Sequence, residues 1–359
     1  MKVATIVGAR PQFIKMAPVS RELRRHFDEI VIHTGQHYDY EMNKVFFEQL
    51  NIPEPDYYLD VGSGSHGYQT GEMLKRIEEV LIKEKPDLVL VYGDTNSTLA
   101  GALAAVKLHI RIAHVEAGLR SFDKKMPEEV NRVLTDHISD YLFAPTETAV
   151  RNLRNEGITQ GVYLTGDVMY DALLYNIEIA RKKSRILKEL GLRPKEYLLA
   201  TVHRAENTDN RKNLENIINA FIESHEPIVF PAHPRTQKYL ITYGLMEKIK
   251  KSPNVLLIPP VGYLDMLVLE ENARKILTDS GGVQKEAYFL KVPCITLRDR
   301  TEWVETVEDG WNILVGADKE RIVRAISEFE PSGKTYSYKF GAGKASSRIV
   351  GIIKEITAR

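Results

Sequence analysis

Acidic side chains follow two apolar runs in the first half of the chain, where they could transfer protons. Asp94 and Glu116 each come directly after a strand-like stretch, and Glu128 follows a proline at a predicted helix start. In an open parallel sheet, ligands bind outside the carboxyl ends of the strands. Several carboxylates gathered there can serve as general acid and base, so the pattern indicates proton-transfer chemistry.

Each of these acids also has a purely structural interpretation. Asp94 could cap the helix expected to begin near residue 96, and Glu128 could compensate a helix dipole and pair with Arg132 one turn on. Glu116 lies between apolar neighbours, so its burial should raise the pKa of its carboxyl group towards neutrality. The combination, rather than any single acid, favours a catalytic role.

The second half of the chain contains residues suited to hold a phosphate. In Thr278-Asp279-Ser280-Gly281-Gly282, Ser280 can cap a helix, and Gly281 and Gly282 expose backbone amides, so a diphosphate would fit. Glu286 lies further along the same helix and could accept hydrogen bonds from a ribose. A capped helix with a surface glutamate is the structural alternative.

Further candidates for anion contacts follow other predicted strands. Arg10 and Lys15 begin the first helix, although that segment could equally be an ordinary strand-to-helix turn. His203 and His233 end two successive predicted strands and could share a crevice wall. No third ligand accompanies them at a typical spacing, so we expect contacts to phosphate or a leaving group and no metal.

Composition limits the class of protein. The chain has 359 residues, 49 basic and 49 acidic, so we expect two domains and no bulk electrostatic attraction to nucleic acid or membrane. The single cysteine, Cys294, lies in an apolar run and is expected to be buried. The chain begins with a predicted strand and has no apolar run of transmembrane length, which favours a cytoplasmic protein.

Short β-branched runs alternate with longer amphipathic segments, which predicts two doubly wound parallel sheets of Rossmann type. Strands are expected near 2–7, 30–34, 87–92, 111–115, 141–144 and 162–165, and then near 197–201, 227–231, 255–258, 275–278, 293–296 and 312–315. Helices are expected near 13–26, 39–50, 68–84, 96–108, 127–138, 146–156, 211–224, 236–250, 262–272, 282–290, 318–328 and 343–357. The predicted domains are 1–168, with the acids, and 169–342, with the phosphate cradle, followed by a C-terminal helix over 343–359.

Taken together and in order, several motifs resemble those of the non-hydrolysing UDP-N-acetylglucosamine 2-epimerases. The resemblance spans nearly the whole chain. It rests on Gly8-Ala9-Arg10-Pro11, Gly93-Asp94-Thr95-Asn96, His114-Val115-Glu116-Ala117-Gly118-Leu119-Arg120, Pro127-Glu128-Glu129-Val130-Asn131-Arg132, His203-Arg204-Ala205-Glu206-Asn207, Thr278-Asp279-Ser280-Gly281-Gly282-Val283-Gln284 and Leu297-Arg298-Asp299-Arg300-Thr301-Glu302.

The resemblance implies a GT-B fold with the active site in an interdomain cleft, and a C-terminal helix that crosses back to the first domain. It also implies a homodimer, a nucleotide-sugar substrate, and neither metal nor nicotinamide cofactor. The implied reaction is reversible epimerisation at C2, by elimination of UDP to 2-acetamidoglucal and re-addition. Asp94 and Glu128 would transfer the protons with support from Glu116, while Arg10, His203 and the Ser280–Gly282 amides would stabilise the diphosphate.

The sequence departs from the family pattern at three places. Gln12 stands where the family commonly has glutamate, and Trp303 where it commonly has arginine. Gln36 and His37 match part of a site at which many bacterial members bind a second substrate molecule as activator, whereas residues 62–69 do not resemble the usual segment.

Other activities remain compatible with the sequence. The nearest are a 2-epimerase of a UDP-2,3-diacetamido uronic acid and a hydrolysing variant that releases free N-acetylmannosamine. A GT-B glycosyltransferase shares the expected fold but would need an acceptor. An inactive nucleotide-sugar-binding regulator is a further alternative, against which the presence of Asp94, Glu116 and Glu128 together counts.

Overall fold

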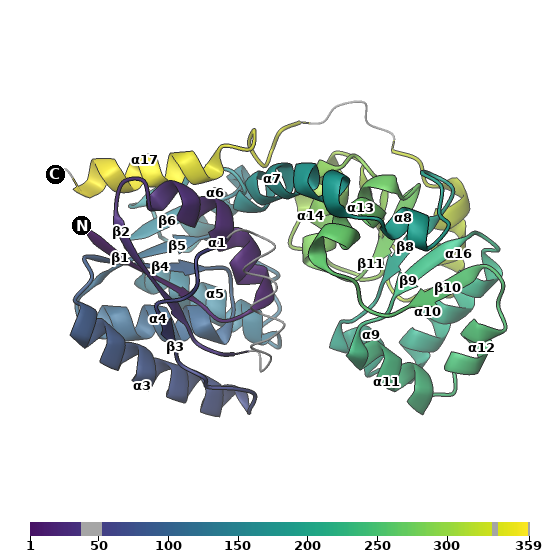
Figure 1. Ribbon diagram of the computed structural model, residues 1–359, viewed down its shortest axis with the longest axis horizontal. Coiled ribbons are helices and arrows are strands. Elements are labelled where there is room, and N and C mark those ends of the chain that lie inside the picture. The colour runs from purple at the N-terminus through teal and green to yellow at the C-terminus, as the bar shows by residue number, and fades with distance from the viewer. Residues whose placement is uncertain (37–51, 332–336, 358–359) are drawn as a thin grey trace. The chain divides into compact units, whose positions relative to one another are not determined.

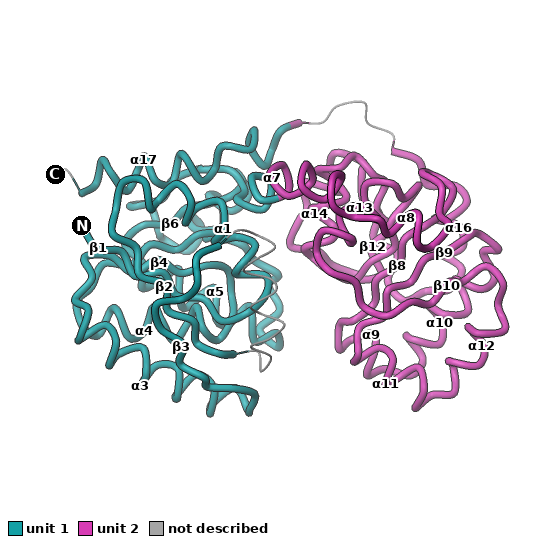
Figure 2. Tube along the Cα trace, viewed as in Figure 1, with its two compact units in different colours: residues 1–172, 338–359 teal, residues 173–337 magenta. Residues whose placement is uncertain are grey.

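The computed structural model describes residues 1–36, 52–331 and 337–357 of the chain (Figure 1). The chain divides into two compact units, which Figure 2 distinguishes by colour. Unit 1 comprises Met1–Ala172 and Tyr338–Arg359, and unit 2 comprises Leu173–Ser337. The division falls inside helix α7 (Val168–Lys183). The helix expected over 39–50 lies outside the described residues.

Unit 1 is built on a seven-stranded sheet whose neighbouring strands are all parallel, in the order β3-β2-β1-β4-β5-β6-β7. The strand order reverses between β1 and β4, because the chain winds outwards from β1 in one direction and from β4 in the other. That reversal is the point at which open α/β sheets bind ligands. The strands are β1 (Lys2–Val7), β2 (Asp28–His33), β3 (Tyr57–Tyr58), β4 (Leu88–Tyr92), β5 (Arg111–Val115), β6 (Tyr141–Ala144) and β7 (Val162–Leu164).

The central strands of unit 1 are mostly apolar, as expected of strands covered on both faces. Every residue of β4 is buried, and Ile6 and Val91 belong to a core that helices α3 and α4 help to cover. The helices of this unit, besides α7, are α1 (Arg10–Leu23), α3 (His66–Glu84), α4 (Asn96–Lys107), α5 (Pro127–Ile138), α6 (Glu147–Asn155) and α17 (Ala345–Thr357).

The last helix, α17, packs against α1 and so belongs to unit 1 (Figure 1). Asp171 holds its first turn: the carboxylate accepts hydrogen bonds from the backbone amides of Ala345 and Ser346, at 3.0 and 2.8 Å, and from the Ser346 hydroxyl. The acid satisfies amides that a helix start leaves without an intrahelical partner and also opposes the positive end of the helix dipole. One side chain therefore fixes the start of the C-terminal helix.

Unit 2 repeats the architecture with six parallel strands in the order β10-β9-β8-β11-β12-β13, and the order reverses between β8 and β11. Its strands are β8 (Leu198–Thr201), β9 (Ile228–Pro231), β10 (Val255–Ile258), β11 (Lys275–Thr278), β12 (Cys294–Thr296) and β13 (Asn312–Leu314). Its helices are α8 (Ile186–Glu189), α9 (Ala205–Thr208), α10 (Arg211–Glu223), α11 (Pro234–Thr242), α12 (Met246–Lys250), α13 (Tyr263–Asn272), α14 (Gly281–Phe289), α15 (Val304–Glu308) and α16 (Lys319–Glu328).

The prediction of two doubly wound, parallel-sheet α/β domains is confirmed. The sequence analysis missed helix α7, and also β3 and the short helices α8, α9 and α15, which are too short for a periodic pattern to emerge. The single helix predicted over 236–250 is divided into α11 and α12. Cys294 is buried as expected, and burial raises the pKa of its thiol to about 12, which suits a packing residue. Among the described helices, none has the length and apolar character needed to cross a bilayer.

Candidate active site

In unit 1, the turns that follow β1, β4 and β5 carry the predicted site residues. Strands β1 and β4 are neighbours on either side of the strand-order reversal, and β4 pairs with β5. Because parallel strands end at the same edge of the sheet, Arg10, Asp94 and Glu116 all emerge at this edge. The topology thus assembles residues that are far apart in the sequence.

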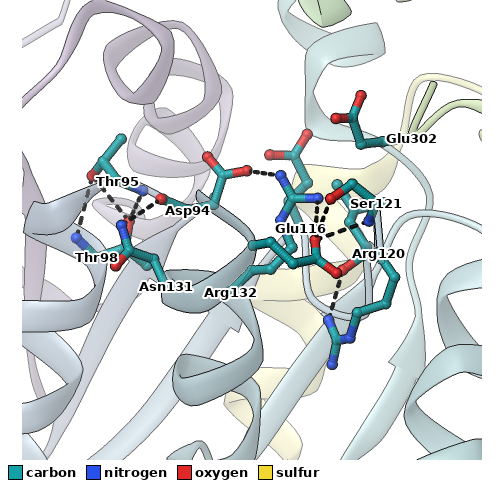
Figure 3. Close-up of polar contacts among 12 residues, drawn as sticks. Asp94, Thr95, Thr98, Glu116, Arg120, Ser121, Asn131, Arg132 and Glu302 are labelled. Atoms are coloured by element: carbon teal, nitrogen blue, oxygen red, sulfur yellow. Dashed lines mark hydrogen bonds and ion pairs between the residues drawn. The ribbon is translucent and has the colours of Figure 1, made fainter. Parts of the chain in front are cut away.

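Asp94 is not the helix cap that its position allowed. The cap of α4 is Thr95, whose hydroxyl accepts a hydrogen bond from the backbone amide of Thr98 at 3.3 Å. The Asp94 carboxylate instead forms an ion pair with the guanidinium of Arg132, and its backbone carbonyl accepts a hydrogen bond from Asn131 at 3.0 Å (Figure 3). Helix α5 therefore fixes Asp94 through two adjacent side chains.

Glu116 is buried, as its apolar neighbours predicted, but it is not an isolated acid. The ammonium group of Lys15, on α1, forms an ion pair with its carboxylate. The backbone of Glu116 has a φ angle of +72°, a left-handed conformation that a residue with a side chain adopts only at a cost. Strained backbone held by surrounding structure is frequent at functional sites.

Glu128 and Glu129 are adjacent in α5 but differ in their surroundings. Glu129 is buried, and its carboxylate accepts hydrogen bonds from the backbone amides of Ser121 and Phe122, at 2.9 and 2.8 Å, and pairs with Arg132 at 3.1 Å. Glu128 is only half-buried. Glu129 therefore holds the loop before α5, and Glu128 is the better placed of the two to meet a ligand.

The turn after β1 is held by Gln12, whose side chain is almost wholly buried. Its carbonyl oxygen accepts hydrogen bonds from the amides of Gly8 and Ala9, at 2.8 and 3.1 Å. Its amide group donates to the backbone oxygen of Tyr92 at 3.0 Å and to the Thr98 hydroxyl at 3.0 Å. Since Gln12 already binds two amides of this turn, the exposed Arg10 side chain is the group of the turn that could contact an anion.

A pocket of about 380 Å³ opens in unit 1 beside Asn96 and Asn131, with Lys124, Lys125 and His66 in its wall.

Gln36, one of the two predicted regulatory residues, accepts hydrogen bonds from the amide and hydroxyl of Ser97 at 3.1 and 2.6 Å. Gln36 therefore anchors the first turn of α4, and the other regulatory residue, His37, lies outside the described residues.

In unit 2, Asp279 fixes the turn that carries His203. Its buried carboxylate, at the end of β11, accepts hydrogen bonds from the backbone amides of His203 and Arg204, both at 3.0 Å, and from the Asn207 side chain at 3.0 Å. Burial lowers the pKa of His203; Asp279 opposes the shift, while Arg204, His233 and Arg235 add to it. Near neutral pH His203 is therefore an uncharged imidazole, which has one N–H group to donate.

His203 and His233 lie together, with their ring centres 6.0 Å apart. His233 also caps helix α11: its Nδ1 atom accepts a hydrogen bond from the backbone amide of Arg235 at 3.2 Å. With Nδ1 accepting, the ring proton of neutral His233 is on Nε2, where it can be donated to an oxygen.

The Ser280–Gly282 turn differs from prediction in one respect. Ser280 occupies the cap position of α14, but within the described residues its hydroxyl makes no capping hydrogen bond. Its backbone amide donates to Thr278 Oγ1 at 2.9 Å. The opening amides of α14 thus follow the end of β11, beside the strand-order reversal, as an anion site requires.

Glu286 is buried next to a second acid, Glu270, which the sequence analysis did not single out. Burial, and then the charge of Glu286 and a hydrogen bond to it, raise the pKa of Glu270 well above its usual value. The raised pKa favours the protonated form of Glu270 beside Glu286. The sequence feature that could have indicated Glu270 is its position as a glutamate within the apolar run of α13.

Trp303, which stands where the family commonly has arginine, packs against a buried lysine. The ammonium group of Lys285, on α14, lies 3.9 Å from the centre of the Trp303 ring, in a cation–π contact. Lys285 is almost fully buried. A side chain at Gly281 would approach the Trp303 indole nitrogen to 3.2 Å, so the ring packs closely against the start of α14. A cation is thus fixed near this turn without the family's arginine.

Comparison with known proteins identifies the family. The family model described as UDP-N-acetylglucosamine 2-epimerase matches residues 21–354. The chain belongs to the UDP-N-acetylglucosamine 2-epimerase family. A UDP-N-acetylglucosamine 2-epimerase homolog of Methanococcus maripaludis is 69% identical over 99% of this chain and 100% of its own length.

Two further relatives of this epimerase-family chain bear on its substrate. The crystal structure of Methanocaldococcus jannaschii UDP-GlcNAc 2-epimerase in complex with UDP-GlcNAc and UDP superposes with a TM-score of 0.92, at 52% identity, over 99% of this chain and 100% of that one. The UDP-2,3-diacetamido-2,3-dideoxy-D-glucuronate 2-epimerase of Pseudomonas aeruginosa is 50% identical over 99% of this chain and 100% of its own length.

Proposed function

We propose that this protein reversibly epimerises UDP-N-acetylglucosamine at C2 to give UDP-N-acetylmannosamine. The observation that carries the proposal is the convergence of Asp94 and Glu116 at the ends of adjacent strands, each beside a fixed cation. The chain's membership of the family, and its similarity to an enzyme crystallised with UDP-GlcNAc and UDP, support the same substrate.

The reaction explains why acids and an anion site belong to one protein. The C2 proton has no adjacent carbonyl, so its removal alone would leave a poorly stabilised carbanion. If the C1–oxygen bond to UDP breaks as the proton leaves, the electron pair of the C2–H bond forms the C1–C2 double bond of 2-acetamidoglucal. UDP then adds back to C1, and a proton delivered to the opposite face of C2 completes the inversion. Two faces of one carbon require two proton-transfer groups.

Unit 1 supplies these groups in our proposal. Asp94 and Glu128 transfer the protons at C2, with Glu116 in support. The ion pairs with Arg132 and Lys15 place a positive charge beside each of the Asp94 and Glu116 carboxylates. Arg10 is exposed at the same edge of the sheet and binds an anionic part of the ligand.

Unit 2 binds UDP in our proposal. The amides of Gly281 and Gly282, which open α14, and neutral His203 donate hydrogen bonds to the diphosphate, and His233 lies close enough to His203 to assist. Glu286, buried beside Glu270, accepts hydrogen bonds from the ribose hydroxyls. These donors stabilise the charge that develops on UDP as its bond to C1 breaks.

The 2,3-diacetamido uronic acid nucleotide is the second candidate substrate, since a 50% identical relative is named for it. It would undergo the same elimination and re-addition, with the same residues. A cofactor-free reaction and a homodimer remain predictions from the family resemblance, and a cytoplasmic location remains a prediction from the sequence itself.

A charge-neutral variant of Glu128 tests the assignment of catalytic groups. We expect Glu128→Gln to bind UDP within about twofold of the unaltered protein but to lose about 10²–10⁴-fold in kcat, the usual contribution of a general acid or base. Glu147→Gln is the matched control, because Glu147 is an exposed acid in the first turn of α6 and contributes only to the helix dipole. Turnover by Glu128→Gln comparable to that of the control would remove Glu128 from the mechanism.

A further inference from the structure

His114 is fully buried in strand β5, and both of its ring nitrogens are in short polar contacts. Nε2 lies 2.7 Å from the backbone oxygen of Gly93, and Nδ1 lies 2.7 Å from a carboxylate oxygen of Asp136. Gly93 immediately precedes Asp94. Asp136 is on α5, one turn after Asn131 and Arg132, which contact Asp94. No step of the proposed reaction uses either His114 or Asp136.

The partners of His114 determine where its protons are. A carbonyl oxygen can only accept, so Nε2 donates to Gly93. Burial alone would raise the pKa of Asp136, but hydrogen bonds and charge from His114 and Arg120 outweigh it and lower that pKa. Asp136 is therefore ionised and accepts from Nδ1. His114 donates at both nitrogens, to two different parts of the chain.

The Asp136 end of this contact holds the turn that follows Glu116. The second carboxylate oxygen of Asp136 accepts from the backbone amide of Gly118 at 3.0 Å and from the Arg120 guanidinium at 2.7 Å. Arg120 in turn pairs with Glu156 at 2.7 Å. This anchored turn supports the left-handed backbone of Glu116.

The Gly93 end holds the turn that carries Asp94. Gly93 has a φ angle of +63°, and its amide donates to the Val115 carbonyl at 3.0 Å, so this turn is already tied to β5 from one side. The bond from His114 ties it from the other side, through the carbonyl of the peptide group that leads into Asp94. One imidazole thus connects the two turns that carry the proposed catalytic carboxylates.

We propose that His114 is a positioning residue, which fixes the Asp94 carboxylate relative to Glu116 by donating to the Gly93 carbonyl and to Asp136. The proposal rests on the proposed function of Asp94 and Glu116. Its energetic basis is that a small misplacement of a catalytic group is costly: an error of about 1 Å can lower a rate about 100-fold. The bond to Gly93 is the one that bears on Asp94, whereas the bond to Asp136 bears on the neighbouring turn.

Two substitutions separate these bonds, because amide side chains of different length reproduce different ring nitrogens. The amide nitrogen of glutamine can reach the position of Nε2 and keep the donor to Gly93, while that of asparagine can reach the position of Nδ1 and keep the donor to Asp136. We expect His114→Asn to lose about tenfold or more in kcat, and His114→Gln to lose no more than about threefold. KM and UDP affinity, measured by calorimetry, should change less than about twofold in both variants.

Val89→Ala, in the buried core of strand β4, is the control for lost stability, since it removes packing and no polar contact. Its kcat should match that of the unaltered protein at a temperature where all variants are folded. If His114→Asn is as active as His114→Gln, or if both lose activity only in step with their melting temperatures, the positioning role is wrong. Absence of C2 proton exchange in the unaltered protein would instead overturn the proposed function itself.

Discussion

Replacing Gln12 by glutamate tests the arrangement of the β1 and β4 turns. The buried side chain receives two backbone amides on one oxygen and donates from its nitrogen to the Tyr92 carbonyl and the Thr98 hydroxyl. A glutamate could keep the two accepted bonds. An ionised glutamate, however, would set a second oxygen against the Tyr92 carbonyl, where only a donor is tolerated.

The size of the effect follows from that lost donor and depends on pH. A buried polar group without a partner costs about 1–3 kcal/mol, so we expect Gln12→Glu to lose about 2 kcal/mol of stability at pH 8. For a domain of this size, that corresponds to a melting temperature about 4–8 °C lower. A protonated glutamate can still donate to Tyr92, so the folded state should raise the pKa of this acid above its unfolded value of about 4.3. The penalty should therefore be about half as large at pH 5 as at pH 8.

The assay is thermal unfolding of the variant and the unaltered protein, compared at pH 5 and at pH 8. Gln237→Glu is the matched control, because the Gln237 amide also donates to a backbone carbonyl, that of Ala232 at 2.9 Å, but at a half-buried position that water can reach. The control should lose less than about 1 kcal/mol at either pH. Equal melting of Gln12→Glu and the unaltered protein at pH 8, or a penalty independent of pH, would refute the reasoning.

Three more substitutions test other contacts. Burial raises the pKa of Glu270, so the folded state binds a proton that the unfolded state releases. As the pH rises above about 4.5, Glu270→Gln should therefore gain stability relative to the unaltered protein, by up to about 1.4 kcal/mol per pH unit. Parallel pH profiles of the two proteins would contradict this. Because the folded state lowers the pKa of His203, the unfolded state binds more protons below about pH 6.5. His203→Gln should therefore lose less stability than the unaltered protein between pH 7 and pH 5.5. Equal losses of stability in urea unfolding would count against the lowered pKa. A methyl group at Gly8 would lie 1.9 Å from the Thr34 hydroxyl, so Gly8→Ala should lose about 3 kcal/mol or more of unfolding free energy. Gly71→Ala is the control, because a methyl group there meets open space in helix α3. It should be neutral or stabilising by up to about 1 kcal/mol in the same unfolding assay.

Much of the fold was predictable because it depends on local patterns. Buried parallel strands are continuous apolar runs and surface helices are amphipathic, so their alternation indicated two doubly wound sheets. Helix α7 was missed because Gly166 and Asp167 are typical of a turn, and the residues beyond them were taken as a domain boundary. Strand β3 has two residues, too few for any alternation.

The candidate site was predictable at the level of residue types, and its pairings were not. Strand ends and the family motifs indicated Asp94, Glu116 and the Ser280–Gly282 turn as functional positions. The partners of these groups come from tertiary packing: Lys15 meets Glu116 from a position 101 residues away, and Asp279 holds the His203 turn from 76 residues away. No periodicity or spacing specifies such contacts, because they depend on how the strands are ordered in each sheet.

The most direct test of the proposed function is incubation of the protein with UDP-N-acetylglucosamine alone in deuterated water, followed by proton NMR. We predict deuterium at C2 and accumulation of UDP-N-acetylmannosamine to a fixed ratio, with no metal or nicotinamide added. Formation of UDP and free N-acetylmannosamine would indicate the hydrolysing reaction instead. If a folded protein that binds UDP shows neither exchange nor product, the assigned substrate is wrong, and the same assay with the 2,3-diacetamido uronic acid nucleotide tests the second candidate.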